Sequence, residues 1–198
     1  MLAHRLERHG ETLTWWDDES LAIELPLPSL ARPVVTNLLS EAAVYLGDEV
    51  DEVIVAKAGS PFLHFTWHGN AGRLTAMSDV YGNRLIVRPD RQGRPYWVEN
   101  DAGMALRIVY QKAFLTAVEL HHFDGINWQP QATLQRYYYD EAGHLVTAEN
   151  GVGECERYRY RPDGVILERR LAGGAGFFWE WEGEGRVARA IRHWSDVA

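Results

Sequence analysis

The chain has 198 residues, of which 46% are hydrophobic and 24% charged; these fractions are typical of folded globular proteins and fit disordered or collagen-like chains poorly. Its formal net charge of −8 and scattered basic residues argue against a nucleic-acid-binding surface, because phosphate contacts need clustered Lys and Arg. Eight Trp, nine Tyr and eighteen Gly against three Met favour strands joined by glycine turns, so we expect an all-β fold.

Cysteine usage and the N-terminal segment bear on where the chain folds. Cys155 is the only cysteine, so no intrachain disulfide can form, and folding in a reducing cytoplasm fits. Residues 1–16 lack the apolar core of a Sec signal, and no run of about 20 apolar residues occurs. We therefore expect neither Sec-dependent export nor a membrane span.

Residues 1–62 are predicted to form a β-rich lead-in region. The segment 10–28, GETLTWWDDESLAIELPLP, predicts a hairpin with its turn at residues 17–20, and the prolines that follow end its second strand. Residues 37–57 are predicted as a helix of about two or three turns followed by a strand, although helix and strand patterns compete there.

From residue 63 to residue 198, glycines recur every 21 residues. Gly143, Gly164 and Gly185 keep this spacing, as do Gly72 and Gly93, and four of these five have a second glycine ten residues further on. The full set of repeat glycines is Gly72, Gly82, Gly93, Gly103, Gly143, Gly153, Gly164, Gly174 and Gly185.

Each repeat glycine of the 21-residue series follows an aromatic strand and precedes a second strand. Asn70, Asp90, Asp140 and Asp163 come shortly before these glycines, and Asx residues with Gly supply a turn and its position of positive φ. We therefore predict a repeat array of antiparallel β-hairpins that forms an extended curved sheet over residues 63–198. The longer stretch 121–140 is expected to bulge or loop out of it.

Aromatic residues occupy two matching offsets in successive units. Because side chains alternate along a strand, the residues at these offsets are predicted to share one face as an aromatic ladder on neighbouring strands. The ladder consists of Tyr137, Tyr139, Tyr158, Tyr160, Trp179 and Trp181.

The unit resembles the YD repeat of bacterial Rhs proteins. The best matches are residues 137–153, YYYDEAGHLVTAENGVG, and residues 69–85, GNAGRLTAMSDVYGNRL. The resemblance implies a β-sheet strip that spirals into a hollow shell around a C-terminal toxin, as in polymorphic toxins and type VI secretion effectors. It further implies a bacterial protein that stays in the cytoplasm until a specialised system exports it.

Two departures from the family limit what carries over. About six units cannot close a shell, so we expect a fragment or one piece of a larger shell, and the self-cleaving Asp-Pro-x-Gly motif is absent. The expected function is a non-enzymatic scaffold that encloses or presents a toxin polypeptide, without cofactor, metal or catalytic residues. Its expected partners are that toxin or further Rhs repeats, and open sheet edges favour self-association.

Two other functions remain open. Exposed Trp and Tyr side chains on a flat sheet would make a carbohydrate-binding module. Glu180 and Glu182 lie two residues apart on one predicted strand, at about 6.6–7 Å, a separation that inverting glycosidases use, which makes a glycosidase the weakest alternative.

The remaining chemistry-bearing side chains are interpreted as structural. His121 and His122 are adjacent, so on a strand they point to opposite faces, and His64 and His68 are about 13 Å apart on a strand, too far to share a metal ion. Cys155 has no activating partner nearby in the sequence, and Ser60 and Ser78 lie in no G-x-S-x-G elbow.

Overall fold

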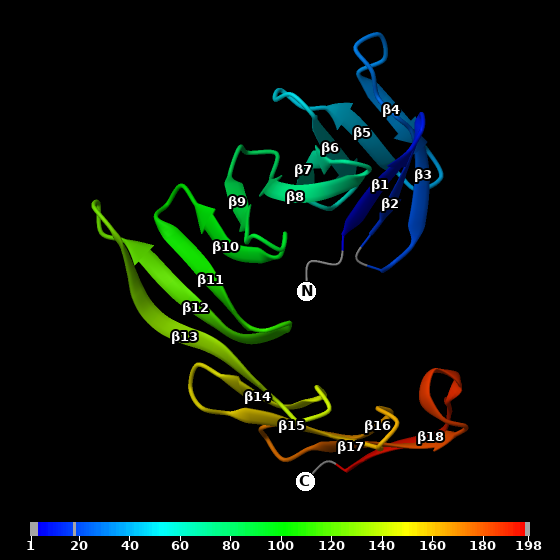
Figure 1. The fold of residues 1–198 in the computed structure, drawn as a ribbon, viewed down its shortest axis with the longest axis vertical. Helices are drawn as coiled ribbons and strands as arrows, with labels where there is room; N and C mark the ends of the chain where they lie inside the picture. The colour runs from blue at the N-terminus through cyan, green and yellow to red at the C-terminus, as the bar shows by residue number, and fades with distance from the viewer. Residues whose placement is uncertain (1–3, 18, 197–198) are drawn as a thin grey trace. The chain divides into compact units, whose positions relative to one another are not determined.

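A computed structural model describes residues 4–17 and 19–196 (Figure 1). Within these ranges the chain forms eighteen strands, antiparallel wherever their register is defined, and no α-helix; one 3-10 turn, η1 (Gly185–Val187), is the single helical element described. The all-β fold built of antiparallel hairpins is therefore confirmed. The chain divides into two compact units, residues 1–105 (unit 1) and residues 106–198 (unit 2).

Unit 1 contains ten strands. They are β1 (Arg5–His9), β2 (Thr12–Trp16), β3 (Ala22–Pro26), β4 (Val34–Asn37), β5 (Ala42–Leu46), β6 (Glu52–Lys57), β7 (Phe62–His68), β8 (Ala71–Ser78), β9 (Arg84–Pro89) and β10 (Pro95–Asn100). Strand β11 (Met104–Gln111) spans the division between the units.

The remaining seven strands belong to unit 2. They are β12 (Phe114–Phe123), β13 (Trp128–Tyr139), β14 (Leu145–Asn150), β15 (Cys155–Tyr160), β16 (Ile166–Arg170), β17 (Gly176–Glu182) and β18 (Arg189–Asp196). Each strand from β12 to β17 pairs with the next strand in the chain.

Strands β1–β8 of unit 1 form a ring. Each is a neighbour of the next, and β1 pairs not only with β2 but also with β8, where Leu6 lies opposite Gly72. The amide of Arg8 extends this seam by donating to the carbonyl of Asn70 at 2.8 Å. The far end of β8 pairs instead with β9, so the sheet continues to β9 and β10.

The ring has a hydrophobic core that comes from alternate residues of its strands. Because alternate side chains of a strand point to opposite faces, each of the strands β1–β7 supplies one or two buried apolar residues to the interior, and Leu74 and Met77 of β8 pack against them partly buried. The buried cluster consists of Leu6, Leu13, Trp15, Ile23, Leu25, Val35, Ala42, Val44, Val53, Val55, Leu63 and Phe65.

The described part of unit 2, residues 106–196, has no comparable core. In the described part of unit 2, the buried residues are His121, Ala148 and Gly176, and most apolar side chains are only half-buried. A sheet must cover its apolar face with a second layer to be stable on its own. The hairpins of unit 2 therefore present surface that a further layer would cover.

Two local predictions are confirmed or corrected in unit 1. The hairpin over residues 10–28 is confirmed, with β2 and β3 joined by a turn in which the amide of Ser20 donates to the carbonyl of Asp17. The helix predicted within residues 37–57 is wrong. Its apolar residues Leu38 and Leu39 lie exposed in a turn, while Val44 on β5 is buried in the core by strand alternation, which overrides local helix propensity.

Residues 121–140 do not loop out of the sheet. They contribute to a long hairpin of β12 and β13, which turns at Asp124–Asn127. The additional residues make both strands longer. The predicted bulge takes the form of register shifts between Val118 and Glu119 and between Leu120 and His121.

The division between the two units falls at a different place from the sequence boundary at residues 62 and 63. That boundary marks where the 21-residue spacing begins. Strand β7 begins at the boundary, with Phe62, and β8 lies after it, yet these two strands complete the ring that residues 1–62 begin.

Candidate functional site

Six hairpin turns share one hydrogen-bonding scheme. In each, the first residue donates its amide to the carbonyl four residues on, and the glycine three residues on donates its amide back to the carbonyl of the first residue, at 2.7–3.3 Å. These turns begin at Asp79, Asp90, Asp140, Asn150, Arg161 and Leu171. Within unit 2 they follow one another at steps of ten or eleven residues.

An Asx side chain reinforces several of these turns. Oδ1 of Asp79 accepts the amides of Tyr81 and Asn83 at 2.9 and 3.0 Å. The Asn83 side chain, which donates to Oδ2, holds the pKa of Asp79 below its usual value. In the same way, the bond from the His144 amide lowers the pKa of Asp140.

Six of the nine repeat glycines occupy these turns, whereas Gly103 lies between β10 and β11 and Gly185 begins η1. Gly82, Gly93, Gly103, Gly143, Gly153, Gly164, Gly174 and Gly185 all have positive φ, between 54° and 93°. Gly72 was expected to be a turn glycine as well, and that expectation is wrong. It lies inside β8, and the tight turn between β7 and β8 uses Gly69, with φ 63°.

The six ladder aromatics are all half-buried, and the exposed residues Tyr138, Arg159 and Glu180 alternate with them. Tyr137 on β13 lies opposite Ala148 on β14, and Ala148 lies opposite Glu156 on β15, so the three side chains share one face of the sheet. However, β14 and β16 separate the aromatic strands β13, β15 and β17, so aromatic residues of successive units lie about 9–10 Å apart. The expectation that they lie on neighbouring strands is therefore wrong.

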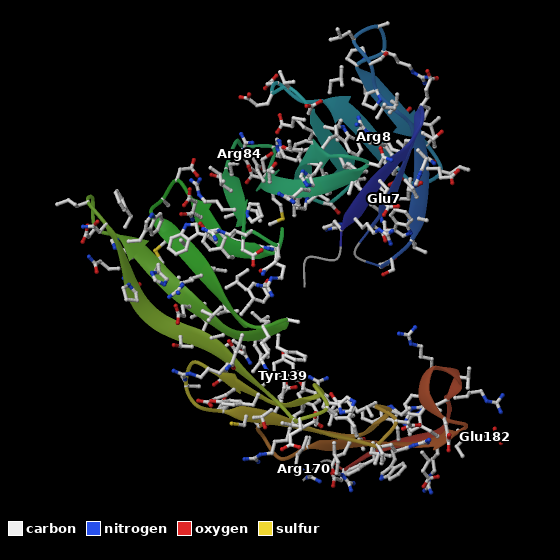
Figure 2. All side chains as sticks on the ribbon, viewed as in Figure 1. Glu7, Arg8, Arg84, Tyr139, Arg170 and Glu182 are labelled. Atoms are coloured by element: carbon white, nitrogen blue, oxygen red, sulfur yellow. The ribbon has the colours of Figure 1, made fainter. Side chains whose placement is uncertain are left out.

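The ladder residues instead contact other side chains and the backbone. Tyr139, labelled in Figure 2, donates its hydroxyl to the carbonyl of Leu115 at 2.8 Å and packs on Phe114 with ring centroids 4.7 Å apart. Tyr160 stacks on His144 at 5.0 Å. Trp181 donates Nε1–H to the carbonyl of Ile166 at 2.6 Å.

Tyr158 belongs to a polar cluster on its face of the sheet. Its hydroxyl donates to Glu156 at 2.7 Å, and Arg169 on the next strand donates to the same carboxylate at 3.0 Å. The bond from Tyr158 lowers the pKa of Glu156, while burial raises the pKa of Tyr158.

The two candidate glycosidase carboxylates form ion pairs across β17 and β18. Glu180 lies 3.6 Å from Arg192, and Glu182, labelled in Figure 2, lies 2.9 Å from Arg189. Both pairs are exposed to solvent. Cys155 is half-buried, and its thiol contacts the carbonyl of Gly153 at 3.7 Å.

A further cluster, which the sequence did not suggest, lies on β6, β7 and β8 of unit 1. Nδ1 of His64 is 3.0 Å from Oε1 of Glu52, and its Nε2 is 2.8 Å from the hydroxyl of Ser78. The His64 and Glu52 side chains are only 10% and 8% exposed. Because Val53, Val55, Leu63 and Phe65 point into the core, the alternating residues Glu52 and His64 lie on the opposite face of the strands.

A hollow of about 610 Å³ opens beside this cluster, and all of its lining residues belong to unit 1. Ser78 and Arg84 line it together with Asn83 and Asn100, and Met77, Leu85 and Pro61 supply an apolar part. Ser78 on β8 lies directly opposite Arg84, the first residue of β9, which is labelled in Figure 2. The Arg84 guanidinium is 3.7 Å from Glu52.

A β-bulge brings Ser78 within reach of His64. Near the β7–β8 turn, Trp67 pairs with Gly72, and this register would place His64 opposite Thr75. The register shifts between His64 and Phe65, so Ala76 lies opposite His64, and Ser78 is its diagonal neighbour on the same face. The Thr75 hydroxyl donates to the carbonyl of His64 at 3.2 Å, which holds the bulge.

Neither a metal-binding cluster nor a membrane-crossing helix occurs in the part of the chain that the structure describes. No three or more His, Cys, Asp or Glu side chains within residues 4–17 and 19–196 are grouped so as to hold a metal ion. Over the same ranges, no helix has the length and apolarity needed to cross a membrane.

No protein-family model matches the chain, and no curated protein is significantly similar to it.

Proposed function

We propose that this chain is a structural scaffold of the Rhs type, whose hairpin sheet encloses or presents another polypeptide. The observation that carries the proposal is the six-fold recurrence of one turn scheme at the ends of short antiparallel strands. In a repeat protein each unit contacts only the units beside it, so further units of two strands and two turns can be added to the strip. A shell built from a strip of sheet requires this property.

The surface of unit 2 supports the same proposal. Its aromatic side chains are half-buried rather than fully buried, and its buried residues within the described range are few. Apolar surface of this kind is stabilised when a second layer covers it. We infer that the covering layer is the presented polypeptide or a further stretch of hairpins from the same protein.

The reading frame on both sides of this segment provides the first test. Further Tyr-Asp hairpin units followed by a variable C-terminal domain would support the shell. A frame that begins at Met1 and stops after Ala198 would remove the shell and leave a free-standing sheet.

Photocrosslinking tests the covered face directly. Tyr158 and Arg159 are adjacent on β15 and point to opposite faces, so p-benzoylphenylalanine at each position makes a matched pair. In the complete gene product, we expect residue 158 to crosslink to sequence outside residues 1–198. Equal crosslinking from residue 159, or none from residue 158, would contradict the proposal.

A second candidate, carbohydrate binding, rests on one aromatic pair in unit 2. Trp194 on β18 is 40% exposed and stacks on Phe178 with an interplanar angle of 15°, and Arg192 lies over its ring at 5.0 Å. The exposed part of this aromatic pair can pack on a sugar ring. Saturable quenching of tryptophan fluorescence by a glycan, lost in Trp194→Ala, would establish this function, and silence across a broad glycan panel would remove it.

A further inference from the structure

We propose that Ser78, His64 and Glu52 form a nucleophilic site in unit 1 that hydrolyses small carboxylic esters. This activity is independent of the scaffold function. It assigns a reaction to a cluster that has the connectivity of an acyl-transfer triad: hydroxyl to Nε2, and Nδ1 to carboxylate.

The hydrogen bonds set the direction of proton transfer. An ionised Glu52 carboxylate can only accept, so Nδ1 of His64 carries the proton that the two share. In the neutral ring Nε2 is then the acceptor, and at 2.8 Å it accepts the hydroxyl proton of Ser78. His64 is thus oriented as a general base toward Ser78, and Glu52 is its positioning residue.

The cluster is buried on one side and accessible on the other. His64 is 8% exposed, whereas Ser78 is partly exposed and lines the 610 Å³ hollow. A substrate can therefore reach the hydroxyl through the hollow, while most of the His64 ring is shielded from bulk solvent. The core residues on the inner face of β6 and β7 fix both strands, which holds the base in place.

Arg84, whose guanidinium lies 3.7 Å from Glu52, also brings positive charge to the hollow that Ser78 lines. It lies directly opposite Ser78 across β8 and β9 and lines the same hollow. A guanidinium beside the nucleophile can stabilise the oxyanion of a tetrahedral intermediate. The apolar part of the hollow, with Met77 and Leu85, suits a short acyl chain.

The reaction has two steps, acylation of Ser78 and hydrolysis of the acyl group. Oγ of Ser78 attacks the ester carbonyl carbon and its proton passes to Nε2 of His64; the tetrahedral intermediate then collapses, and the leaving alcohol takes that proton. This leaves an acyl group on Ser78. Water then attacks the acyl carbon with His64 as base, the acid product departs, and the proton returns to Oγ.

The decisive experiment uses a fluorophosphonate on the full 198-residue chain, with the modified residue identified by mass spectrometry. We expect one adduct, on Ser78, and release of p-nitrophenol from p-nitrophenyl butyrate. His64→Asn should slow both reactions by roughly 10²–10⁴-fold, the usual contribution of a general base. Ser78→Ala should abolish both, and Ser60→Ala, which alters an exposed serine outside the cluster, should change neither.

Glu52→Gln tests the positioning role separately. The ¹⁵N chemical shifts of His64 report which of its two ring nitrogens is protonated. If Glu52 positions His64, Glu52→Gln should change both this tautomer and the labelling rate of Ser78 while the protein stays folded. A purely structural Glu52 would not change both. Absence of label on Ser78 in folded wild-type chain, or a labelling rate unaffected by His64→Asn, would overturn it.

Discussion

Gly72 on β8 lies directly opposite Leu6 on β1, in the short seam that closes the ring of unit 1. A Cβ at residue 72 would come within 2.9 Å of both Cβ and Cδ2 of Leu6, whose side chain is fully buried. Leu6 cannot retreat, because the core surrounds it.

We therefore predict that Gly72→Ala opens the ring at this seam. Overpacking of this kind costs about 1–3 kcal/mol of unfolding free energy. Hydrogen exchange at the amides of Leu6 and Arg8, which face β8, should become faster. Gly173→Ala is the control, because an added Cβ there meets no atom within 4 Å; equal protection in the two variants would contradict the prediction.

Two turn glycines of unit 2 make a second matched pair. Gly143 and Gly153 have nearly the same backbone conformation, φ 87° and 84°, so alanine strains both by about 1–3 kcal/mol. Only at Gly143 would the new Cβ also collide with Phe114, at 2.8 Å. Gly143→Ala should lower the unfolding free energy more than Gly153→Ala in urea titrations. Equal losses would show that the Phe114 ring moves aside.

The buried Asp17 should make unit 1 sensitive to acid. The hydrogen bond from the Lys57 ammonium, at 2.7 Å, and the amides of Leu21 and Glu19 hold the pKa of Asp17 below its ordinary value of 3.8, against the opposing effect of burial. A lowered folded-state pKa means that this stabilisation is present above pH 3.8 and is lost as pH falls through the folded-state value.

The Asp17→Asn variant isolates that effect. At neutral pH we expect it to lose about 1–3 kcal/mol, because the amide cannot replace the charged acceptor of Lys57. Chemical unfolding of both proteins between pH 7 and pH 2 measures the difference. The gap should narrow below pH 3.8 as wild-type Asp17 is protonated, and a gap that stays constant would show that Asp17 contributes no pH dependence.

Tyr139 should stabilise the β12–β13 hairpin through its hydroxyl. Tyr139→Phe removes the bond to the Leu115 carbonyl but keeps the ring against Phe114, so we expect a loss of about 1 kcal/mol. Tyr137→Phe is the control, since no hydrogen bond from the Tyr137 hydroxyl is found among the described residues. Thermal unfolding measures both, and equal losses would contradict the assigned role.

Most local structure of this chain could be predicted from its sequence. Aromatic alternation and Asx-x-x-Gly turns are local signals, and they located the hairpins that turn at Asp90 and Asp140. The seam between β1 and β8 left no such signal, because it joins segments more than 60 residues apart and depends on the packing of the whole ring.

The cluster of Glu52, His64 and Ser78 was missed for a related reason. Its members come from three strands, and their proximity depends on the bulge at Thr75, a one-residue shift that alternation alone cannot reveal. A search for His and Ser at diagonal positions of a hairpin, with a bulge allowed, would have found two of the three.

The pairing pattern also sets the order in which the chain can fold. Every ladder from β12 to β18 joins consecutive strands, so in unit 2 each hairpin can form as soon as its own residues have left the ribosome. The ring of unit 1 cannot close until residue 72 has been made, because Gly72 is the partner of Leu6. During synthesis, one edge of β1 therefore stays unpaired until β8 has been made. Because an unpaired strand edge can pair with other chains, we expect misfolding to start in nascent unit 1.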